Sequence, residues 1–521
     1  MKIERTKNAG KNILFGTVLR VYQILVPFAM RTALIYILGA QYLGLNSLFS
    51  SVLQVLNLAE LGVGNAMVYS MYKPIAEDDT ATICALMALY RKYYRIIGLV
   101  ILCTGLCITP LLPKLIKMNT VPEGINIYIL YLLNLGATVI SYWLFAYKNC
   151  LLTAFQRVDI TSKISLIVSF LGYVLQFVVL LILHNFYLYT VVLLITGIIN
   201  NIVTAIVVDR LFPGYHPSGV LPEEEVKTIN GRVRDLFTSK IGSVIYDSAD
   251  TIVISAFLGM TVLAIFQNYY FILTSITGFI AVVFTACSAG IGNSLVVETK
   301  AKNYNDLTKF SFIICWISCF CSSCLLCLYQ PFMELWVGRD LMLEFSAVVC
   351  IVLYFYIRQI NSLLNLYKDA SGMWHEDRFR PLCAALTNLI LNLLLVRVWG
   401  IYGVLLSTVF AILFVGVPWL LHNLFTVIFE KHLLGTYLRK LGIYVIMSFI
   451  ICTVTYLICN LIQKTLLITF LLRLLLCAFL PNILFYLSFR HMPEFKQSIE
   501  LADNMTKKRF HKILMHLGGV S

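Results

Sequence analysis

The chain has 521 residues, of which 60% are hydrophobic and only 13% are charged, and its formal net charge is +14. A soluble domain carries roughly 25% charged residues, so this composition excludes an ordinary globular protein and indicates one that lies in a lipid bilayer. The basic residues are scattered over short connecting segments and form no basic run interleaved with aromatic residues, which argues against nucleic acid as a partner.

Long apolar runs recur along the chain and reach the ~20 residues that cross ~30 Å of hydrocarbon as a helix. Because lipid satisfies no backbone hydrogen bonds, each spanning run must be helical. The sequence therefore predicts an all-α, polytopic membrane protein with about fourteen transmembrane helices. The expected helices are 12–38, 45–72, 82–112, 124–147, 161–183, 187–208, 233–258, 262–296, 307–330, 341–367, 380–397, 400–425, 438–460 and 465–489.

The first expected helix follows a basic N-terminus. It is too long, and too interrupted by Arg20 and Arg31, to be the apolar core of a cleaved signal sequence. Placing the N-terminus in the cytoplasm puts most of the 40 Lys and Arg residues on that side, where such residues near helix ends are retained. Both termini are therefore expected in the cytoplasm. The basic residues left on the outer side are Lys114, Lys117, Arg339, Arg397 and Lys464.

Two breaks divide the expected helices into groups. One is a Pro-, Gly- and charge-rich segment after six helices, and the other lies near Glu430. The Gly-x-Gly-Asn sequences that begin at Gly62 and Gly290 fall in the second helix of each six-helix group, which favours two pseudo-symmetric, parallel repeats of the kind transporters place around a central site. The expected parts are an N-terminal six-helix bundle, 1–208, a cytoplasmic inter-bundle loop, 209–232, a C-terminal six-helix bundle, 233–427, two additional transmembrane helices, 428–489, and a basic cytoplasmic tail, 490–521.

Four basic residues, Arg20, Arg31, Arg358 and Arg473, fall within expected spans. A charge at mid-bilayer costs at least ~2.5 kcal/mol unless a cavity or a partner receives it. Arg20 and Arg31 lie about three turns apart and so share roughly one face of the first helix. Arg31 and Arg358 are expected to face a cavity. Arg473 is expected to extend to an interface, an alternative that also applies to Arg20.

Three acids in the expected spans could match these cations. Glu60 could form a structural ion pair with a basic residue of the first helix, or it could be a titrating acid or sodium ligand coupled to transport. Asp247 and Asp250 share a helix face and could coordinate a cation or pair with Arg358. For Glu60, and for Asp247 with Asp250, both alternatives stay open.

Polar side chains on the same helices are candidate contacts for a sugar or phosphate, although they could equally hold helices together. The selected residues are Asn57, Asn268 and Tyr269. The sequence contains no phosphate-binding loop of the G-x-x-x-x-G-K-[ST] type, no H-E-x-x-H motif and no clustered His. We therefore expect no cofactor, no metal site, no catalytic residues and no enzymatic activity, with H+ or Na+ as candidate coupling ion.

Five cysteines crowd the expected ninth helix, and Cys321 and Cys324 have the spacing of a redox C-x-x-C motif. Within an apolar helix Cys packs as a small hydrophobic residue, and no His or acidic ligand accompanies these. We therefore interpret them as packing residues.

Two stretches resemble a known family. They are RTALIYILGAQYLGLNSLFSSVLQVLNLAELGVGNAMVYSMYKPIAEDD, residues 31–79, and KDASGMW followed by DRFRPLCAALTNLILNLLLVRVWGIYGVLLST, residues 368–408. These sequences resemble the polysaccharide-type (Wzx-like) flippases of the multidrug/oligosaccharidyl-lipid/polysaccharide (MOP) exporter superfamily. The resemblance covers most of the first 425 residues, and the last two helices match by hydropathy only.

This resemblance implies translocation of undecaprenyl-pyrophosphate-linked oligosaccharide repeat units across the bacterial cytoplasmic (inner) membrane by alternating access, for cell-surface polysaccharide biosynthesis. Two bundles would alternate around a cationic central cavity, with the lipid tail of the cargo in the membrane lipid. Arg31 and Arg358 suit that cargo because a guanidinium grips phosphate oxygens through a rigid fork of donors. The alternatives are a lipid II flippase and a cation-coupled multidrug exporter of the same superfamily. Short outer loops disfavour a membrane glycosyltransferase or polymerase.

Overall fold

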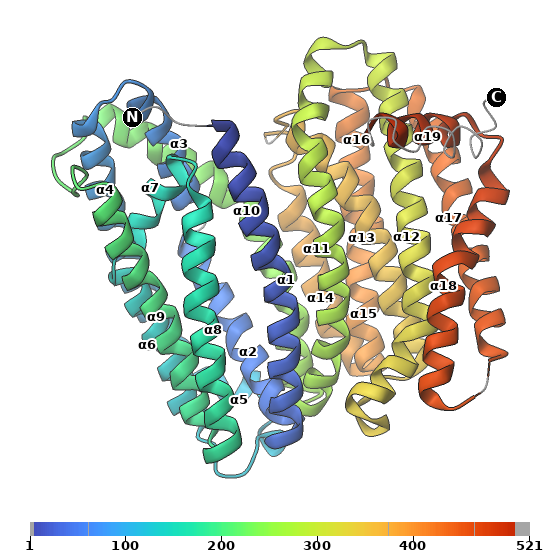
Figure 1. Cartoon of the computed structure of the whole chain (residues 1–521), viewed down its shortest axis with the longest axis horizontal. Helices are drawn as coiled ribbons and strands as arrows, with labels where there is room; N and C mark the ends of the chain where they lie inside the picture. The colour runs from blue at the N-terminus through green and yellow to red at the C-terminus, as the bar shows by residue number, and fades with distance from the viewer. Residues whose placement is uncertain (1–4, 61, 374, 463, 506–521) are drawn as a thin grey trace. The chain divides into compact units, whose positions relative to one another are not determined.

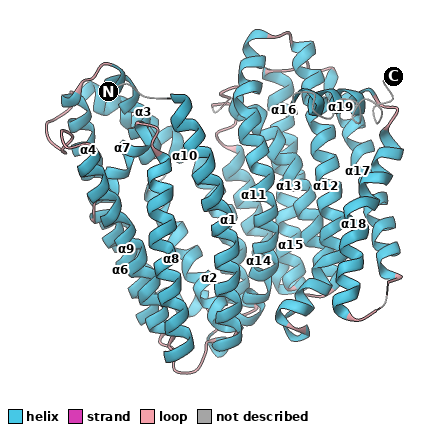
Figure 2. Ribbon diagram, in the orientation of Figure 1, coloured by secondary structure: helices cyan, strands magenta, loops and turns pink. Residues whose placement is uncertain are grey.

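The protein is described from a computed structural model, which covers residues 5–60, 62–373, 375–462 and 464–505. These residues form helices and no strand, so the predicted all-α class is confirmed (Figure 2). The chain divides into two compact units, residues 1–267 and 268–521, with the boundary inside helix α11 (Figure 1). The inter-bundle boundary at 209–232 stays a prediction. Each unit is described by itself below.

The first unit contains α1 to α10. Its helices are α1 (Arg5–Ile37), α2 (Ala40–Leu56), the short η1 (Asn57–Glu60), α3 (Val63–Ala76), α4 (Thr80–Ile108), α5 (Leu112–Leu115), α6 (Ile127–Trp143), α7 (Asn149–Ala154), α8 (Val158–Leu183), α9 (Phe186–Leu211) and α10 (Glu223–Phe257). Helix α1 packs on α8, α8 on α9, α4 on α6, and α2 on α10. Helix α10 begins within the segment expected to be a loop, and three Glu residues occupy its first turn, where acids favour a helix N-terminus.

The second unit contains the rest of α11 and the helices that follow. These are α11 (Met260–Val297), α12 (Lys300–Val337), α13 (Phe345–Ala370), α14 (Arg380–Trp399), α15 (Ile401–Phe410), the π-helical η6 (Ala411–Gly416), α16 (Val417–Val427), α17 (Leu433–Asn460), α18 (Leu466–Phe489) and α19 (Pro493–Met505). Helix α12 is central, since α13, α17, α18 and α19 all pack against it.

The helix expected over 45–72 is broken in two, which the hydropathy pattern did not reveal. The chain leaves α2 at Leu56, makes the 3₁₀ turn η1, and resumes as α3 after Gly62, whose φ of 89° lies in the left-handed region that glycine accepts without strain. Glu60 is the last residue of η1 and therefore lies at this break.

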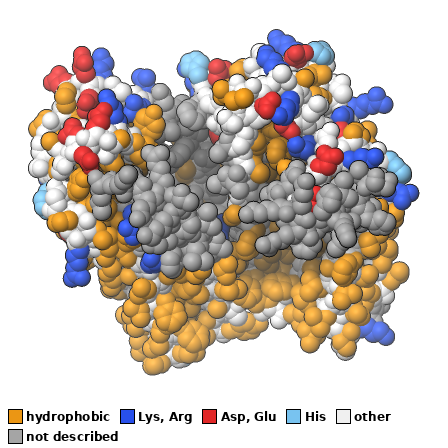
Figure 3. Space-filling view, turned by 45° about the horizontal axis from the view of Figure 1, so that its top comes forward, with side chains coloured by type: hydrophobic (Ala, Val, Ile, Leu, Met, Phe, Trp, Pro, Cys, Tyr) orange, Lys and Arg blue, Asp and Glu red, His pale blue; other side chains and the backbone are white. Residues whose placement is uncertain are grey.

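Eleven of the described helices are long and apolar enough to cross a bilayer, or twelve if α6 and the segment Ala146–Ala154, bent by 49°, make one span. This is fewer than the roughly fourteen expected, because α2 and α3 are short pieces and α10 is rich in polar residues. Charged side chains gather toward one end of the helices in each unit, and hydrophobic side chains cover much of the remaining visible face (Figure 3). The chain is a multi-pass membrane protein.

Helix α19 lies in the segment expected to be a basic tail and is fixed to the second unit. Its Phe495 is buried against the rings of Phe312 and Trp316. Its Glu494 accepts a hydrogen bond from the Lys440 ammonium of α17 over 2.6 Å. An aromatic anchor and an ion pair therefore hold the start of the C-terminal segment on the bundle.

Candidate functional site

Arg31 lies on α1 in the first unit and is half-buried. Its Nη1 donates to the backbone carbonyl of Gln267 over 3.3 Å. Tyr173 of α8 and Tyr189 of α9 are close enough to interact with it electrostatically. These three side chains come from three helices, so the guanidinium is surrounded by polar groups within a membrane helix bundle.

Glu60 is the centre of a hydrogen-bonded group of tyrosines. Tyr94 of α4 donates to its Oε1 over 2.6 Å, and Tyr142 of α6 donates to its Oε2 over 2.7 Å. Tyr90 in turn donates to the Tyr94 hydroxyl over 2.6 Å. Both carboxylate oxygens thus accept from phenols, and hydrogen bonds to a charged group are worth about 1.5–3 kcal/mol each.

The partners of Glu60 differ from those of two other acids, Asp159 and Asp377. Asp159 accepts from the Arg157 Nε over 3.0 Å and from the Lys163 Nζ over 3.3 Å. Asp377 likewise pairs with Arg380. Glu60 makes no ion pair with any residue that the structure describes, and its partners there are neutral hydroxyls. The expected alternative of an ion pair with the first helix is therefore not seen among the described residues.

Arg358 lies on α13 in the second unit and is also half-buried. Its Nη1 donates to the Tyr354 hydroxyl over 2.6 Å and to the Tyr270 hydroxyl over 3.2 Å. Tyr354 precedes it by one helical turn, whereas Tyr270 belongs to α11. The guanidinium is therefore held in a fixed orientation by two helices.

A π-helical turn faces the same helix α13. A Cβ added to Gly416 of η6 would lie 4.0 Å from the Asn361 Oδ1, an atom that is buried without a hydrogen-bond partner among the described residues. π-helical turns within α-helical segments frequently lie at functional sites. Asn361 follows Arg358 by about one turn, so this face of α13 carries a cation and an unsatisfied amide oxygen.

Asn268 and Tyr269 are adjacent in α11 but lie in different surroundings. Asn268 is 1% exposed, and neither its Oδ1 nor its Nδ2 has a hydrogen-bond partner among the residues described. Such a buried amide costs about 1–3 kcal/mol, which suggests that a ligand or water satisfies it. The Tyr269 hydroxyl instead donates to Gln330 and accepts from the Leu343 amide, so this geometry gives it a packing role.

The remaining predicted site residues are less defined. Arg20 is exposed on α1. The Asn57 Oδ1 is buried without a partner in the described part of the chain. Asp250 is half-buried on α10, and the side chain of Asp247 lies outside the described residues. The assignments of all nine site residues stay predictions. Four tyrosines near the site residues were not predicted from the sequence: Tyr90, Tyr94, Tyr142 and Tyr354. The i, i+4 spacing of Tyr90 with Tyr94, and of Tyr354 with Arg358, could have indicated three of them.

The folded chain is similar to solved structures of membrane transporters. For a structure titled lipid II flippase MurJ, inward closed conformation, the TM-score is 0.70 at 16% sequence identity, covering 92% of this chain and 99% of that chain. For an inward-facing multidrug resistance MATE family transporter of the MOP superfamily, the TM-score is 0.59 at 15% identity, covering 81% and 99%. The chain therefore shares the fold of these two transporters.

At these identities the likeness shows the fold and leaves the cargo open. A MATE structure in a bent conformation matches with a TM-score of 0.52 at 14% identity, covering 84% of this chain and 97% of that one. No protein-family model and no curated protein matches the sequence. These structural neighbours are a flippase and transporters, and the likeness confirms the predicted fold.

Proposed function

We propose that this protein is a flippase that moves polyprenyl-pyrophosphate-linked oligosaccharide units across the bacterial cytoplasmic membrane by alternating access. The observation that carries the proposal is Arg358, a cation within a membrane helix whose guanidinium is oriented by two tyrosine hydroxyls. Because keeping a charge in a membrane helix is costly, such residues mark pathways for a substrate or ion. An oriented guanidinium can grip two phosphate oxygens at once.

Arg31 supports the same cargo from the first unit. It is fixed by the Gln267 carbonyl and lies near two tyrosines. A drug exporter for cationic cargo needs acids and aromatic rings at its site, and an arginine there would repel the cargo. The two arginines therefore favour an anionic cargo over the multidrug alternative.

Glu60 is the proposed coupling residue. Phenols donate to both of its carboxylate oxygens, and because a phenol can also accept, one hydroxyl can turn to receive the O–H of a protonated carboxyl. A sodium ion would need several oxygen lone pairs at once, so more than one of these hydroxyls would have to turn toward it. We therefore propose H+ rather than Na+ as the coupling ion.

A lipid II flippase is the second candidate, because the structure titled lipid II flippase MurJ covers nearly the whole chain. Both cargoes carry a pyrophosphate that an oriented arginine can bind, and they differ in the sugar. The test is reconstitution of the full chain in liposomes with fluorescent undecaprenyl-pyrophosphate oligosaccharide, lipid II or a cationic drug, measured in parallel. We expect the oligosaccharide lipid to cross fastest. Faster movement of lipid II would assign the second candidate, and movement of the drug alone would overturn the proposal.

A further inference from the structure

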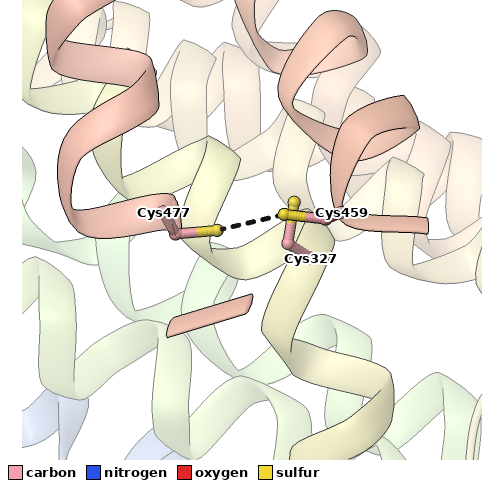
Figure 4. Close-up of side chains that lie close together, drawn as sticks. All are labelled: Cys327, Cys459 and Cys477. Atoms are coloured by element: carbon pink, nitrogen blue, oxygen red, sulfur yellow. Dashed lines mark hydrogen bonds between the residues drawn. The ribbon is translucent and has the colours of Figure 1, made fainter. Parts of the chain in front are cut away.

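Three cysteine thiols from three helices of the second unit converge inside the bundle. They belong to Cys327 of α12, Cys459 of α17 and Cys477 of α18, and their exposed fractions are 0%, 1% and 0%. All three sulfur atoms lie within 4.8 Å of one another, and the Sγ atoms of Cys459 and Cys477 are 3.9 Å apart (Figure 4). The cluster thus brings together residues from distant parts of the chain.

These distances suit a metal ion. A metal bound to sulfur at about 2.3 Å holds its sulfur ligands roughly 4 Å apart. A disulfide would need the two sulfur atoms at about 2.05 Å. The 3.9 Å separation of Cys459 and Cys477 fits two ligands of one ion, as it fits two thiols in contact, and all three cysteines are free thiols.

Other buried thiols lie elsewhere in the second unit. The Cys319 thiol of α12 contacts the Ser448 carbonyl at 3.8 Å, and the Cys452 thiol of α17 contacts the Cys319 carbonyl at 3.7 Å. Each of these thiols thus finds a backbone acceptor, as a small buried residue does. Cys327, Cys459 and Cys477 differ because three thiols lie within 4.8 Å of one another, the arrangement that a metal ion needs.

The neighbourhood limits which ion the cluster can take. The side chains packed around it are Cys324, Leu328, Tyr456 and Leu476, which make a largely apolar shell. The Cys324 thiol contacts the Cys477 carbonyl at 4.0 Å and is not one of the three thiols that lie within 4.8 Å of one another. Structural zinc sites need four ligands, and a three-ligand zinc site adds a water. Thiolates also select Cu(I), and a monovalent d¹⁰ ion accepts two or three sulfur ligands without water. Three thiols in an apolar shell therefore favour Cu(I) over Zn²⁺.

The guanidinium of Arg473 lies near the cluster and can balance the charge of a thiolate. Arg473 precedes Cys477 by one turn on α18 and is close enough to Cys459 for an electrostatic interaction. Its Nε is buried and has no hydrogen-bond partner in the described part of the chain. A buried guanidinium nitrogen without a partner is costly, and an anionic metal–thiolate group nearby would lower that cost.

We propose that Cys327, Cys459 and Cys477 bind one Cu(I) ion, with Arg473 as a charge-balancing neighbour. Two thiols lose their protons to water as two copper–sulfur bonds form, leaving a bis-thiolate copper group of charge −1 that the +1 of Arg473 neutralises. The third sulfur completes the coordination as a neutral ligand. The ion joins α17 and α18 to α12 and stabilises the second unit. This inference does not depend on the proposed transport function.

The test is an anaerobic titration of the purified, reduced full chain with Cu(I) against the chelator bathocuproine disulfonate. We expect one chelator-resistant Cu(I) per chain and a sulfur-only first shell in copper X-ray absorption. The variant Cys327→Ser/Cys459→Ser/Cys477→Ser should lose this ion. The matched control Cys103→Ser/Cys107→Ser/Cys321→Ser, which removes three thiols outside the cluster, should keep it.

Single substitutions keep the proposal testable if the triple variant does not fold. Arg473→Gln should lower the Cu(I) affinity about 10- to 100-fold, as loss of an outer-shell partner does, and Cys477→Ser should lower it further. Arg473→Lys should restore most of the affinity. Equal Cu(I) binding by the cluster variants and the control, or no chelator-resistant Cu(I) in the unchanged chain, would overturn the proposal.

Discussion

Tyr142 of α6 donates its hydroxyl proton to the Oε2 of Glu60 over 2.7 Å, and so ties a residue of the helix break to a distant helix. Tyr94 closes the other side of the same carboxylate. The break at η1 and the two tyrosines thus hold Glu60 in one place without a described counter-ion. Removing any one of these groups should have a separate, measurable effect.

Glu60→Gln should make the transport rate insensitive to an imposed proton gradient, because an amide cannot take up or release the coupling proton. The rate itself should fall about tenfold or more, the order lost when a group that acts in proton transfer is removed. The measurement is the flipping rate of fluorescent undecaprenyl-pyrophosphate oligosaccharide in liposomes with and without a proton gradient across the membrane. A response to the gradient equal to that of the unchanged chain would rule out Glu60 as the coupling residue.

Tyr142→Phe should lower stability by about 1–3 kcal/mol, because one oxygen of a charged, half-buried carboxylate loses its donor. The measurement is the thermal unfolding midpoint in detergent. Tyr128→Phe on the same helix α6 is the matched control, since Tyr128 is exposed. Equal midpoints for the two variants would show that the Tyr142 hydrogen bond contributes nothing.

Gly44→Ala should destabilise the first unit by about 1–3 kcal/mol through overpacking. A Cβ on Gly44 would overlap the backbone oxygen of Met260, and a backbone atom cannot move aside cheaply. Gly136→Ala in α6 is the control because its Cβ would meet nothing within 4 Å, and it should gain about 0.5–1 kcal/mol of helix stability. Thermal midpoints of both variants test this contrast, which equal midpoints would contradict.

Asp79 should contribute stability that depends on pH. It caps α4, and hydrogen bonds from the Thr82 hydroxyl and backbone N–H lower the pKa of its carboxyl. Because the folded-state pKa lies below the unfolded value, this stability is present above the unfolded pKa and is lost as the pH falls through the folded pKa. Asp79→Asn should therefore flatten the acid side of the profile of thermal midpoint against pH. An unchanged acid side would contradict the role of the cap.

Hydropathy and charge placement were enough to predict the all-α membrane fold and most helices within a few residues. They also singled out Arg31 and Arg358, because a charge in an apolar run is conspicuous in sequence. The break before Gly62 was not predicted, although Asn57, Glu60, Gly62 and Gly64 lie there, because membrane helices also contain such residues. Only the folded chain shows the positive φ of Gly62 and the tyrosines of α4 and α6 that bond Glu60.

The cluster of Cys327, Cys459 and Cys477 was not predicted from the sequence, for a related reason. Cys327 lies in a helix with four other cysteines, whereas Cys459 and Cys477 belong to helices that reach it only in the folded bundle. Within α12, Cys321 and Cys324 have the spacing of a C-x-x-C motif, and the cysteines of this helix were interpreted as packing residues. Local spacing reports which residues share a helix face, and only the tertiary packing reports which thiols meet.

The role of the two arginines can be tested most directly by binding. The full chain is titrated with fluorescent undecaprenyl-pyrophosphate oligosaccharide as unchanged protein, as Arg31→Gln, as Arg358→Gln and as Arg339→Gln, an exposed control. Each of the first two variants should lose about 1.5–3 kcal/mol of binding, or roughly 10- to 150-fold in affinity, because a charge-assisted contact to pyrophosphate is removed. Arg339→Gln should bind as the unchanged chain does. Affinities of Arg31→Gln and Arg358→Gln equal to that of the control would contradict the account.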